Sequence, residues 1–259
     1  TGGNCIIIST PNGVGNLFHK LYSEADQGLN DFNPTMLPWD VHPDRDHAWF
    51  EKETKNMSKR EIAQEHECNF IMSGDTLING KDLIRIESEE IEEPEYKVGF
   101  DRNLWIWKQP EEGKKYFMVA DVARGDGKDN STFYIFETNS MDVCCEYQGK
   151  LPLDSYARFI YDTSKNYGFC LTVVENNSVG MTVLTKLREL GHPKLYYSKK
   201  VTHDYVEQGY AEGMSAVVAG FTTSVKTRPM IISKLEEFIR NKVLKIKSKR
   251  LFNELKTFI

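Results

Sequence analysis

The chain has 259 residues, of which 40% are hydrophobic and 12% aromatic, and its formal net charge is −5. This composition is ordinary for one large or two small globular domains, and it excludes disordered, collagen-like and coiled-coil chains. No apolar run reaches the roughly 18 residues of a transmembrane helix, and no basic region of a signal peptide opens the chain. The five cysteines show no C-x-x-C spacing and predict free thiols in a reducing compartment.

The charge is unevenly distributed along the chain. Residues 1–115 hold 13 Lys and Arg against 22 Asp and Glu, whereas residues 186–259 hold 15 against 7. A basic end on an acidic protein indicates either a local contact with a polyanion or a solvated helix surface. Charge alone does not separate these two interpretations.

The N-terminal part begins with an apolar run at residues 5–8, which is β-branched and typical of a buried strand. The loop 9–13 follows, because Pro11 cannot donate to a ladder and Asn12-Gly13 readily takes a turn conformation. Apolar side chains at helical spacing then predict a helix near residues 17–22.

Two further signals organise the next hundred residues. Ser58 and Glu61 form a capping box, which predicts a helix that continues to about Asn69. Residues 86–97 carry six Glu and one Pro, and they indicate an exposed boundary or linker.

From Tyr116 the pattern changes to strands and helices in succession. The first three strands have short connections and predict an antiparallel meander, after which helices and strands alternate. Expected strands are 116–120, 132–136, 143–147, 171–174 and 195–197, and expected helices follow Pro152, cover 183–190 and start at Pro229 and Ser248.

This β-β-β-α-β-α-β-α order is that of the ribonuclease H-like fold. The fold class is therefore α/β, with a mixed five-stranded sheet flanked by helices. The assignment is an analogy at the level of fold and does not define the chemistry.

Two carboxylates end strands that are parallel neighbours in this fold. Asp121 closes the first strand and Glu175 the fourth, so both side chains should meet at one edge of the sheet. Neighbouring carboxylates repel each other unless a cation is present, and Mg²⁺ prefers such oxygen ligands. Asp129, across a glycine-containing loop, is a second-rank ligand. The ordinary alternative is that acids at strand ends are merely exposed or cap the backbone.

Further residues are candidates for positioning and for phosphate contacts. Asn177 or Ser178 can cap the helix after Glu175. The hydroxyl-rich loop 220–229 is either a phosphate-binding loop or a flexible surface loop. The basic run has few aromatic neighbours and favours contact with a nucleic-acid backbone over base stacking, with a solvated helix pair as the alternative. The candidate DNA-binding residues are Lys226, Arg228, Arg240, Lys242, Lys245, Lys247, Lys249 and Arg250.

Several motifs together resemble the large terminase subunit of tailed double-stranded DNA phages. The order and spacing of these motifs carry the resemblance, which extends over nearly the whole chain. The matching stretches are I-I-I-S-T-P-N-G from Ile6, Q-E-H-E-C-N-F from Gln64, S-G-D-T-L-I from Ser73, V-A-D-V-A-R-G-D-G-K-D from Val119, V-V-E-N-N-S-V-G from Val173 and the segment 220–229.

The resemblance implies three parts: the C-terminal tail of a P-loop ATPase domain at 1–75, a linker or hinge at 76–115, and a ribonuclease H-like nuclease domain at 116–259. Ser9, Thr10 and Pro11 would couple ATP hydrolysis to DNA translocation in the parent protein. The Walker A and Walker B motifs are absent from the chain and would lie upstream, so ATP would be a cofactor of the full-length parent only. The family's third acid, expected just after the E-L-x-T-F match at Glu254, is also absent from the chain.

The implied function is a metal-dependent endonuclease of a viral DNA-packaging motor, which cuts concatemeric genomic DNA when headful packaging begins and ends. Asp121 and Glu175 would bind Mg²⁺ or Mn²⁺, and two such ions would promote attack of water on the phosphodiester. The implied partners are double-stranded DNA, the portal protein of the procapsid and the small terminase subunit, with no membrane. The implied location is the host cell cytoplasm, with transient docking on the procapsid.

Two alternatives remain open at this point. One is another ribonuclease H-like nuclease, such as a junction resolvase or a transposase core, which would prefer branched or end-specific DNA. The other is a non-catalytic module that binds DNA or portal, for which binding would not depend on metal.

Overall fold

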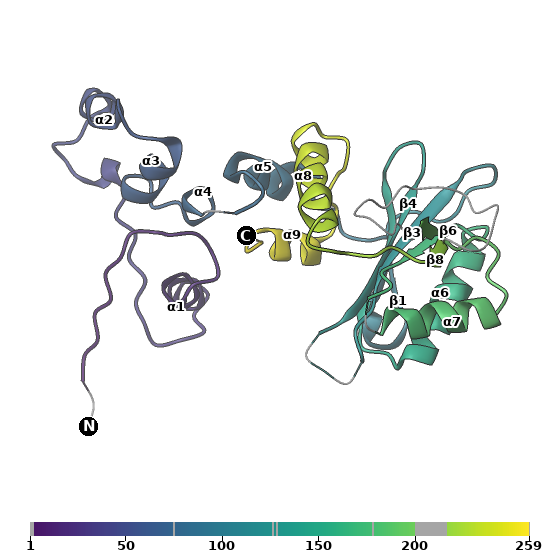
Figure 1. Cartoon of the computed structure of the whole chain (residues 1–259). Helices are drawn as coiled ribbons and strands as arrows, with labels where there is room; N and C mark the ends of the chain where they lie inside the picture. The colour runs from purple at the N-terminus through teal and green to yellow at the C-terminus, as the bar shows by residue number, and fades with distance from the viewer. Residues whose placement is uncertain are drawn as a thin grey trace. The chain divides into compact units, whose positions relative to one another are not determined.

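The computed structural model describes residues 3–74, 76–125, 127, 129–177, 179–199 and 217–258 (Figure 1). The chain divides into two compact units. The first comprises residues 1–91 and 249–259, and the second comprises residues 92–248. The first division falls within the Glu-rich stretch 86–97. The boundaries of an ATPase tail, a linker and a nuclease domain remain a prediction.

The first unit is built from short helices. Its α-helices are α1 (Leu17–Asp26), α2 (His47–Thr54), α3 (Lys59–Glu65), α4 (Phe70–Ser73), α5 (Gly80–Arg85) and α9 (Lys249–Leu255), with the 3₁₀ turn η1 (Trp39–Val41) and the π-helical turn η2 (Ile86–Glu90). The capping box expected at the start of α3 is confirmed, because the side chains of Ser58 and Glu61 each bind the backbone N–H of the other residue.

Two expectations for this unit are wrong. The run 5–8 forms no strand and is exposed, with 84% of Ile6 and 90% of Ile8 accessible. A strand needs a neighbour for its backbone hydrogen bonds, and the described residues of this unit contain no strand that could pair with it. In addition, α3 ends at Glu65 rather than near Asn69, since Cys68 takes a φ of 53° that no helix continues.

The second unit contains a mixed six-stranded sheet in the order β1-β2-β5-β4-β3-β6. The expected meander is confirmed, because β4 pairs antiparallel with both β3 and β5, and β6 lies parallel to β3. The strands are β1 (Tyr96–Val98), β2 (Leu104–Ile106), β3 (Tyr116–Asp121), β4 (Ser131–Glu137), β5 (Val143–Gly149) and β6 (Leu171–Val174).

The expected five strands therefore need correction at both edges of the sheet. β1 and β2 lengthen one edge, although they lie in the segment 76–115 assigned to a linker. β1 is exposed at all three residues, so no alternation of apolar and polar side chains marks it in the sequence. At the other edge, the run 195–197 touches β6 only through a bridge between Thr172 and Leu195. The chain then forms β7 (Tyr197–Lys199), which pairs with β8 (Val217–Ala219) in a separate two-stranded sheet.

Helices α6 (Leu153–Asn166) and α7 (Gly180–Glu189) lie side by side and cover the sheet (Figure 1). The helix α8 (Thr227–Arg240) follows β8. Apolar side chains of α6 and α7 join those of β3 and β4 in one core, and each fully buried large side chain contributes about 1.5–3 kcal/mol. The core residues include Met118, Phe133, Ile135, Tyr156, Ile160, Val183, Leu184 and Leu187. None of the described helices is long and apolar enough to cross a membrane.

A buried histidine in this unit makes its stability sensitive to acid. His192 is 7% exposed, and its Nδ1 accepts a hydrogen bond from the Lys194 N–H at 3.2 Å. Its Nε2 lies 2.9 Å from the Ser164 hydroxyl and 3.2 Å from that of Thr172. Burial, with a smaller contribution from the Lys194 charge, lowers the pKa of His192 from 6.5 to about 4. The ring is therefore neutral in the fold.

We expect the protein to lose about 2–3 kcal/mol of stability between pH 6.5 and pH 4 because of this residue. In that window the unfolded chain binds a proton that the folded ring rejects, so the free energy of unfolding falls as the pH falls. Urea unfolding at several pH values should show the slope, and His192→Gln should flatten it. An unchanged slope in His192→Gln, or an equal flattening in the exposed control His42→Gln, would contradict this assignment.

Candidate nuclease site

The structure brings the carboxyl ends of β3 and β6 together. In the parallel register Ala120 lies opposite Val174, and the N–H of Glu175 donates to the carbonyl of Ala120 at 2.9 Å. Asp121 and Glu175, the next residue on each strand, therefore project at the same edge of the sheet. This is the juxtaposition that the sequence predicts for the two acids.

The neighbouring Glu175 perturbs the carboxyl group of Asp121. Desolvation and a hydrogen bond shared with Glu175 raise the pKa of Asp121 to about 6, against the opposing effect of the Val122 N–H, which donates to Asp121 Oδ1 at 2.8 Å. Asp129 is exposed and adds a smaller electrostatic contribution to the same shift. Two negatively charged carboxylates at this distance repel each other, and a cation bound between them would stabilise both.

Residues beyond these acids hold the pair in place. The Asn177 amide donates both to Glu175 Oε1 and to the carbonyl of Thr223, each at 3.0 Å. The fully buried Tyr156 donates its hydroxyl to the carbonyls of Asp121 and Thr132 at 3.1 and 2.7 Å. One residue thus orients the Glu175 side chain, and the other anchors the end of β3.

The side chain of Asn177 therefore does not cap the helix α7, although the sequence predicts Asn177 or Ser178 for that role. The N-cap of α7 is Val179, and none of the side chains that the structure describes caps this helix. Ser178, the other candidate cap, lies outside the described residues. Nothing in the local sequence indicates the contact between Asn177 and Glu175, because it depends on the carbonyl of Thr223, 46 residues further along.

Two glycines allow the backbone to close around the site. A Cβ at Gly180 would lie 1.8 Å from the carbonyl oxygen of Glu175, and one at Gly220 would lie 2.4 Å from that of Val174. Gly220 also has a φ of +82°. Both distances are far inside van der Waals contact, so any larger residue would force the α7 start or the β8 end away from β6.

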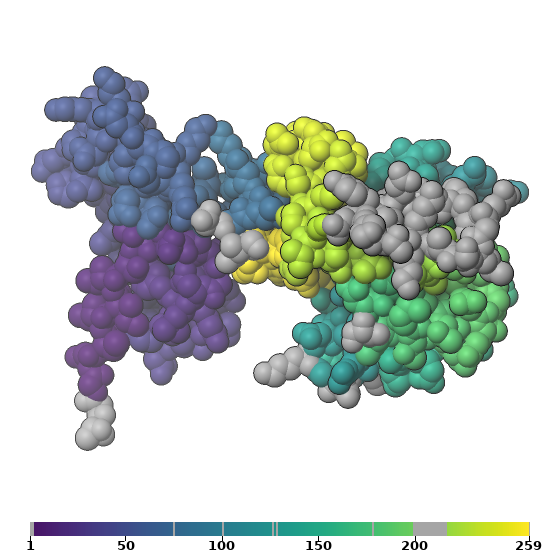
Figure 2. Space-filling model, in the orientation of Figure 1, coloured from purple at the N-terminus to yellow at the C-terminus, as the bar shows by residue number. Residues whose placement is uncertain are grey.

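The basic residues fall into separate groups. Lys226 and Arg228 are exposed at the start of α8, and Lys242 and Lys245 are exposed beyond the helix. The segment of α8 forms the yellow-green surface in Figure 2. Arg240 pairs with Glu236 at 3.0 Å, and both residues lie on α8.

Lys247 is a different case within the same run. It is only 7% exposed and pairs with Glu92 at 2.9 Å, so its ammonium is held inside the protein. The burial argues against its expected role in DNA contact. Lys249 and Arg250 belong to the other unit.

The coupling residues also belong to the first unit. Ser9 and Thr10 are exposed, with the Thr10 hydroxyl 3.4 Å from Glu65, and Pro11 is buried. Their proposed role in coupling remains a prediction.

The described residues contain no cluster of three or more His, Cys, Asp or Glu side chains that could hold a metal ion. What they do contain is a carboxylate pair at the edge of a mixed sheet, with a strand order and helical cover typical of ribonuclease H-like domains.

No family model and no curated protein matches the sequence. The fold is similar to that of the large terminase nuclease from thermophilic phage G20c. The crystal structure with bound magnesium superposes with a TM-score of 0.51 at 14% identity, over 70% of this chain and 79% of that one. The structures with bound cobalt and zinc both give a TM-score of 0.50 at 14% identity, and the shared regions cover 79% and 88% of those chains. At this identity the likeness establishes the fold, and the fold expected for the nuclease part is confirmed.

Proposed function

We propose that this chain contains the endonuclease of a viral DNA-packaging terminase, which cuts concatemeric genomic DNA at the beginning and end of headful packaging. The single observation that carries the proposal is the convergence of Asp121 and Glu175 at the ends of parallel strands, in a fold shared with a phage terminase nuclease. The motifs around both acids and their order along the chain support the same assignment.

The carboxylate pair fits a hard divalent cation. Asp121 and Glu175 offer oxygen ligands, and the repulsion between the two carboxylates supports binding of a cation between them. The similar nuclease has been crystallised with bound magnesium, cobalt and zinc. We propose Mg²⁺ or Mn²⁺ as the physiological ion, with Asp129 as a further, second-rank ligand. When bound, the ion would stabilise negative charge on the phosphate and make water a stronger nucleophile.

The chain's own residues set the geometry for this chemistry. Asn177 donates to one oxygen of Glu175 and so restrains the orientation of this carboxylate. Tyr156 fixes the backbone of Asp121, and Gly180 lets α7 begin directly against β6. These contacts keep the two carboxylates at one place before substrate arrives, which lowers the reorganisation that the reaction needs.

The exposed bases at the start of α8 would hold the DNA backbone. Lys226 and Arg228 come shortly after Thr223, the residue bonded to Asn177, so they lie close in sequence to the site. Contacts of this kind read phosphates rather than bases, so cleavage should be largely independent of sequence. Lys242 and Lys245 extend the proposed surface.

The wider terminase role follows from the same proposal. The portal protein of the procapsid and the small terminase subunit would be the protein partners. The chain would work in the host cell cytoplasm while docked on the procapsid, and the ATPase motor would belong to the full-length parent.

Incubation with supercoiled plasmid and Mg²⁺ or Mn²⁺ tests the proposal. We expect nicked and then linear products without sequence preference, and complete inhibition by EDTA. Preference for four-way junctions over plain duplex would favour a resolvase instead. A non-catalytic module would instead bind duplex DNA equally tightly with and without metal. It would show neither cleavage nor binding of Mn²⁺.

The double variant Lys226→Gln/Arg228→Gln should weaken binding to any duplex sequence. Loss of two phosphate contacts should reduce the slope of log K against log salt by about 1.8, because each contact releases about 0.9 counterion. Fluorescence anisotropy of a labelled duplex in EDTA over a range of KCl concentrations measures both effects. A charge-matched control, Lys165→Gln/Arg188→Gln at exposed positions of α6 and α7, should change the slope much less. Equal slopes in the two double variants would refute the assignment.

A further inference from the structure

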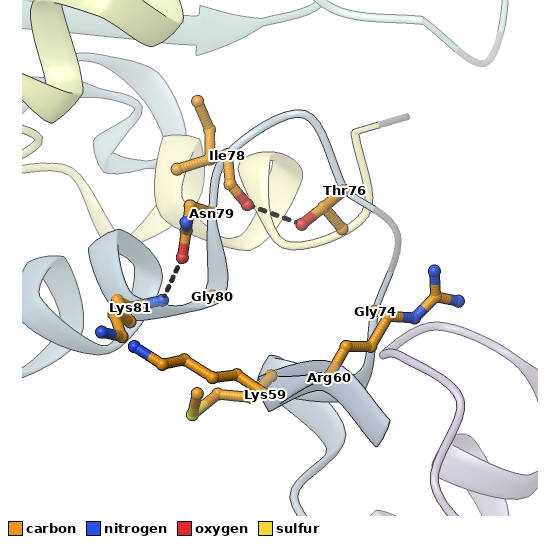
Figure 3. Close-up of a pocket in the computed structure, with 9 residues that line it drawn as sticks. Lys59, Arg60, Gly74, Thr76, Ile78, Asn79, Gly80 and Lys81 are labelled. Atoms are coloured by element: carbon orange, nitrogen blue, oxygen red, sulfur yellow. Dashed lines mark hydrogen bonds between the residues drawn. The ribbon is translucent and has the colours of Figure 1, made fainter. Parts of the chain in front are cut away.

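A cavity of about 310 Å³ lies in the first unit, apart from the carboxylate pair (Figure 3). Its walls come from the start of α3, the end of α4 and the segment that leads into α5. This volume is at the lower end of the range for small-molecule sites. The lining residues are Lys59, Arg60, Met72, Gly74, Thr76, Ile78, Asn79, Gly80 and Lys81.

The backbone holds two lysines at fixed places on this cavity. Lys59 is the first residue of α3, where the Ser58 hydroxyl accepts from the Glu61 N–H at 3.2 Å and Glu61 Oε2 accepts from the Ser58 N–H at 2.7 Å. Lys81 lies at the start of α5, and its N–H donates to Asn79 Oδ1 at 2.9 Å. A Cβ at Gly80 would lie 2.9 Å from the Cα of Met72, so this glycine lets α5 begin directly against α4.

The side chains of Lys59 and Lys81 point toward each other across the cavity (Figure 3). Contact with the Lys81 ammonium, and repulsion from its charge, lower the pKa of Lys59. Arg60 runs in the opposite direction along α3 and donates its Nε to the carbonyl of Ser73 at 3.1 Å. Among the residues that the structure describes, no carboxylate forms an ion pair with either lysine. The two positive charges therefore lie near each other, and no acidic side chain in the part of the chain that the structure describes neutralises them.

We propose that this cavity binds a phosphate group, with the ammonium groups of Lys59 and Lys81 donating to its oxygens. Each ammonium has three donors and no acceptor, so the pair requires an anion with several acceptor oxygens. A phosphate monoester or free phosphate carries a charge of about −1.5 to −2 at pH 7, which balances two lysines, and a DNA phosphodiester carries one negative charge. The shared chemistry is the phosphate, and its source is either the DNA backbone or a free phosphate compound. The inference does not depend on the nuclease assignment, since it concerns the other unit.

The test compares the whole chain with the double variant Lys59→Gln/Lys81→Gln and with the charge-matched control Lys52→Gln/Lys55→Gln, whose lysines are exposed in the same unit. Inorganic phosphate and pyrophosphate are titrated by calorimetry at constant ionic strength. We expect binding to weaken by about tenfold or more in the first variant, because two charged hydrogen bonds are lost, and to stay within about twofold of wild type in the control. Lys59→Arg/Lys81→Arg should keep most of the affinity.

A thermal melt without phosphate separates a binding role from a structural one. Removing the repelling pair should leave the unfolding temperature unchanged or raise it, whereas a structural role would lower it. Two results would identify the DNA backbone as the source of the phosphate. A labelled duplex would compete with phosphate, and Lys59→Gln/Lys81→Gln would bind this duplex more weakly than the control does. Phosphate binding without such competition would identify a free compound. Equal phosphate affinity in the two glutamine double variants, or no binding by wild type, would overturn the proposal.

Discussion

Replacing Asp121 by Asn or Glu175 by Gln should abolish metal-dependent cleavage of plasmid DNA and leave the fold intact. Each change removes one of two carboxylates that converge at the ends of β3 and β6. Charge stabilisation by a bound divalent ion contributes several kcal/mol to such reactions, and about 1.4 kcal/mol corresponds to a tenfold change in rate. We therefore expect cleavage to fall by about 100-fold or more in either variant.

The stability of these variants should move in the opposite direction to their activity. Asp121 is exposed at the end of β3, and partial desolvation together with the neighbouring Glu175 raises its pKa to about 6. An uncharged amide at either position relieves this repulsion in the metal-free protein. The unfolding temperature without metal should therefore stay the same or rise. Added Mn²⁺ should stabilise the wild type but not these variants.

A series of neighbouring variants sharpens this experiment. Asp162→Asn, an exposed acid on α6, should cut and bind Mn²⁺ like wild type. Asn177→Ala frees the Glu175 side chain without removing a carboxylate, so its activity should fall less than that of Glu175→Gln. Plasmid cleavage by Asp121→Asn or Glu175→Gln at the wild-type rate would remove these acids from the catalytic site.

The substitution Gly180→Ala should cost about 3 kcal/mol or more of stability and disable the site. The new Cβ would lie 1.8 Å from the carbonyl oxygen of Glu175 and 2.9 Å from its carbonyl carbon. No side-chain rotation relieves a clash between a Cβ and a main-chain atom, so α7 must move away from β6. This movement would shift Glu175 together with the turn in which the Gly180 N–H donates to the carbonyl of Asn177.

Gly127→Ala is the matched control for this prediction, since a Cβ there meets no atom within 4 Å and φ is not in the left-handed region. Its unfolding temperature should differ little from that of wild type. Thermal unfolding and Mn²⁺-dependent cleavage of both variants are the measurements. A Gly180→Ala protein with wild-type stability and activity would show that α7 does not begin directly against β6.

The sequence predicts best those helices and strands in which the pattern of apolar side chains shows which face is buried. β3, β4 and β5 alternate or run apolar and have short connections, so their antiparallel meander follows from local pattern. α6 and α7 show apolar residues at helical spacing, and both helices are found. The run 5–8 has an equally strong apolar pattern, yet it is exposed and forms no strand, because a strand also needs a partner that its own residues cannot supply.

The basic C-terminal region shows the same limit for charged residues. Lys247 and Lys245 look alike in the sequence, but Lys247 is buried against Glu92 and Lys245 is exposed. The two residues of that ion pair are 155 positions apart. Charge pattern therefore predicts a basic surface but not which of its members are free to face solvent.

The sequence by itself determined the strand-end positions of Asp121 and Glu175, because hydrophobic runs stop where polar residues begin. The tertiary structure decided that these acids share a hydrogen bond, that Asn177 holds Glu175, and that Lys59 faces Lys81. Each of these contacts joins segments that are distant in the chain or depends on a third segment, as Asn177 depends on Thr223. Local patterns report which side of an element is buried, whereas the partner of a polar group is set by the packing of whole elements against each other.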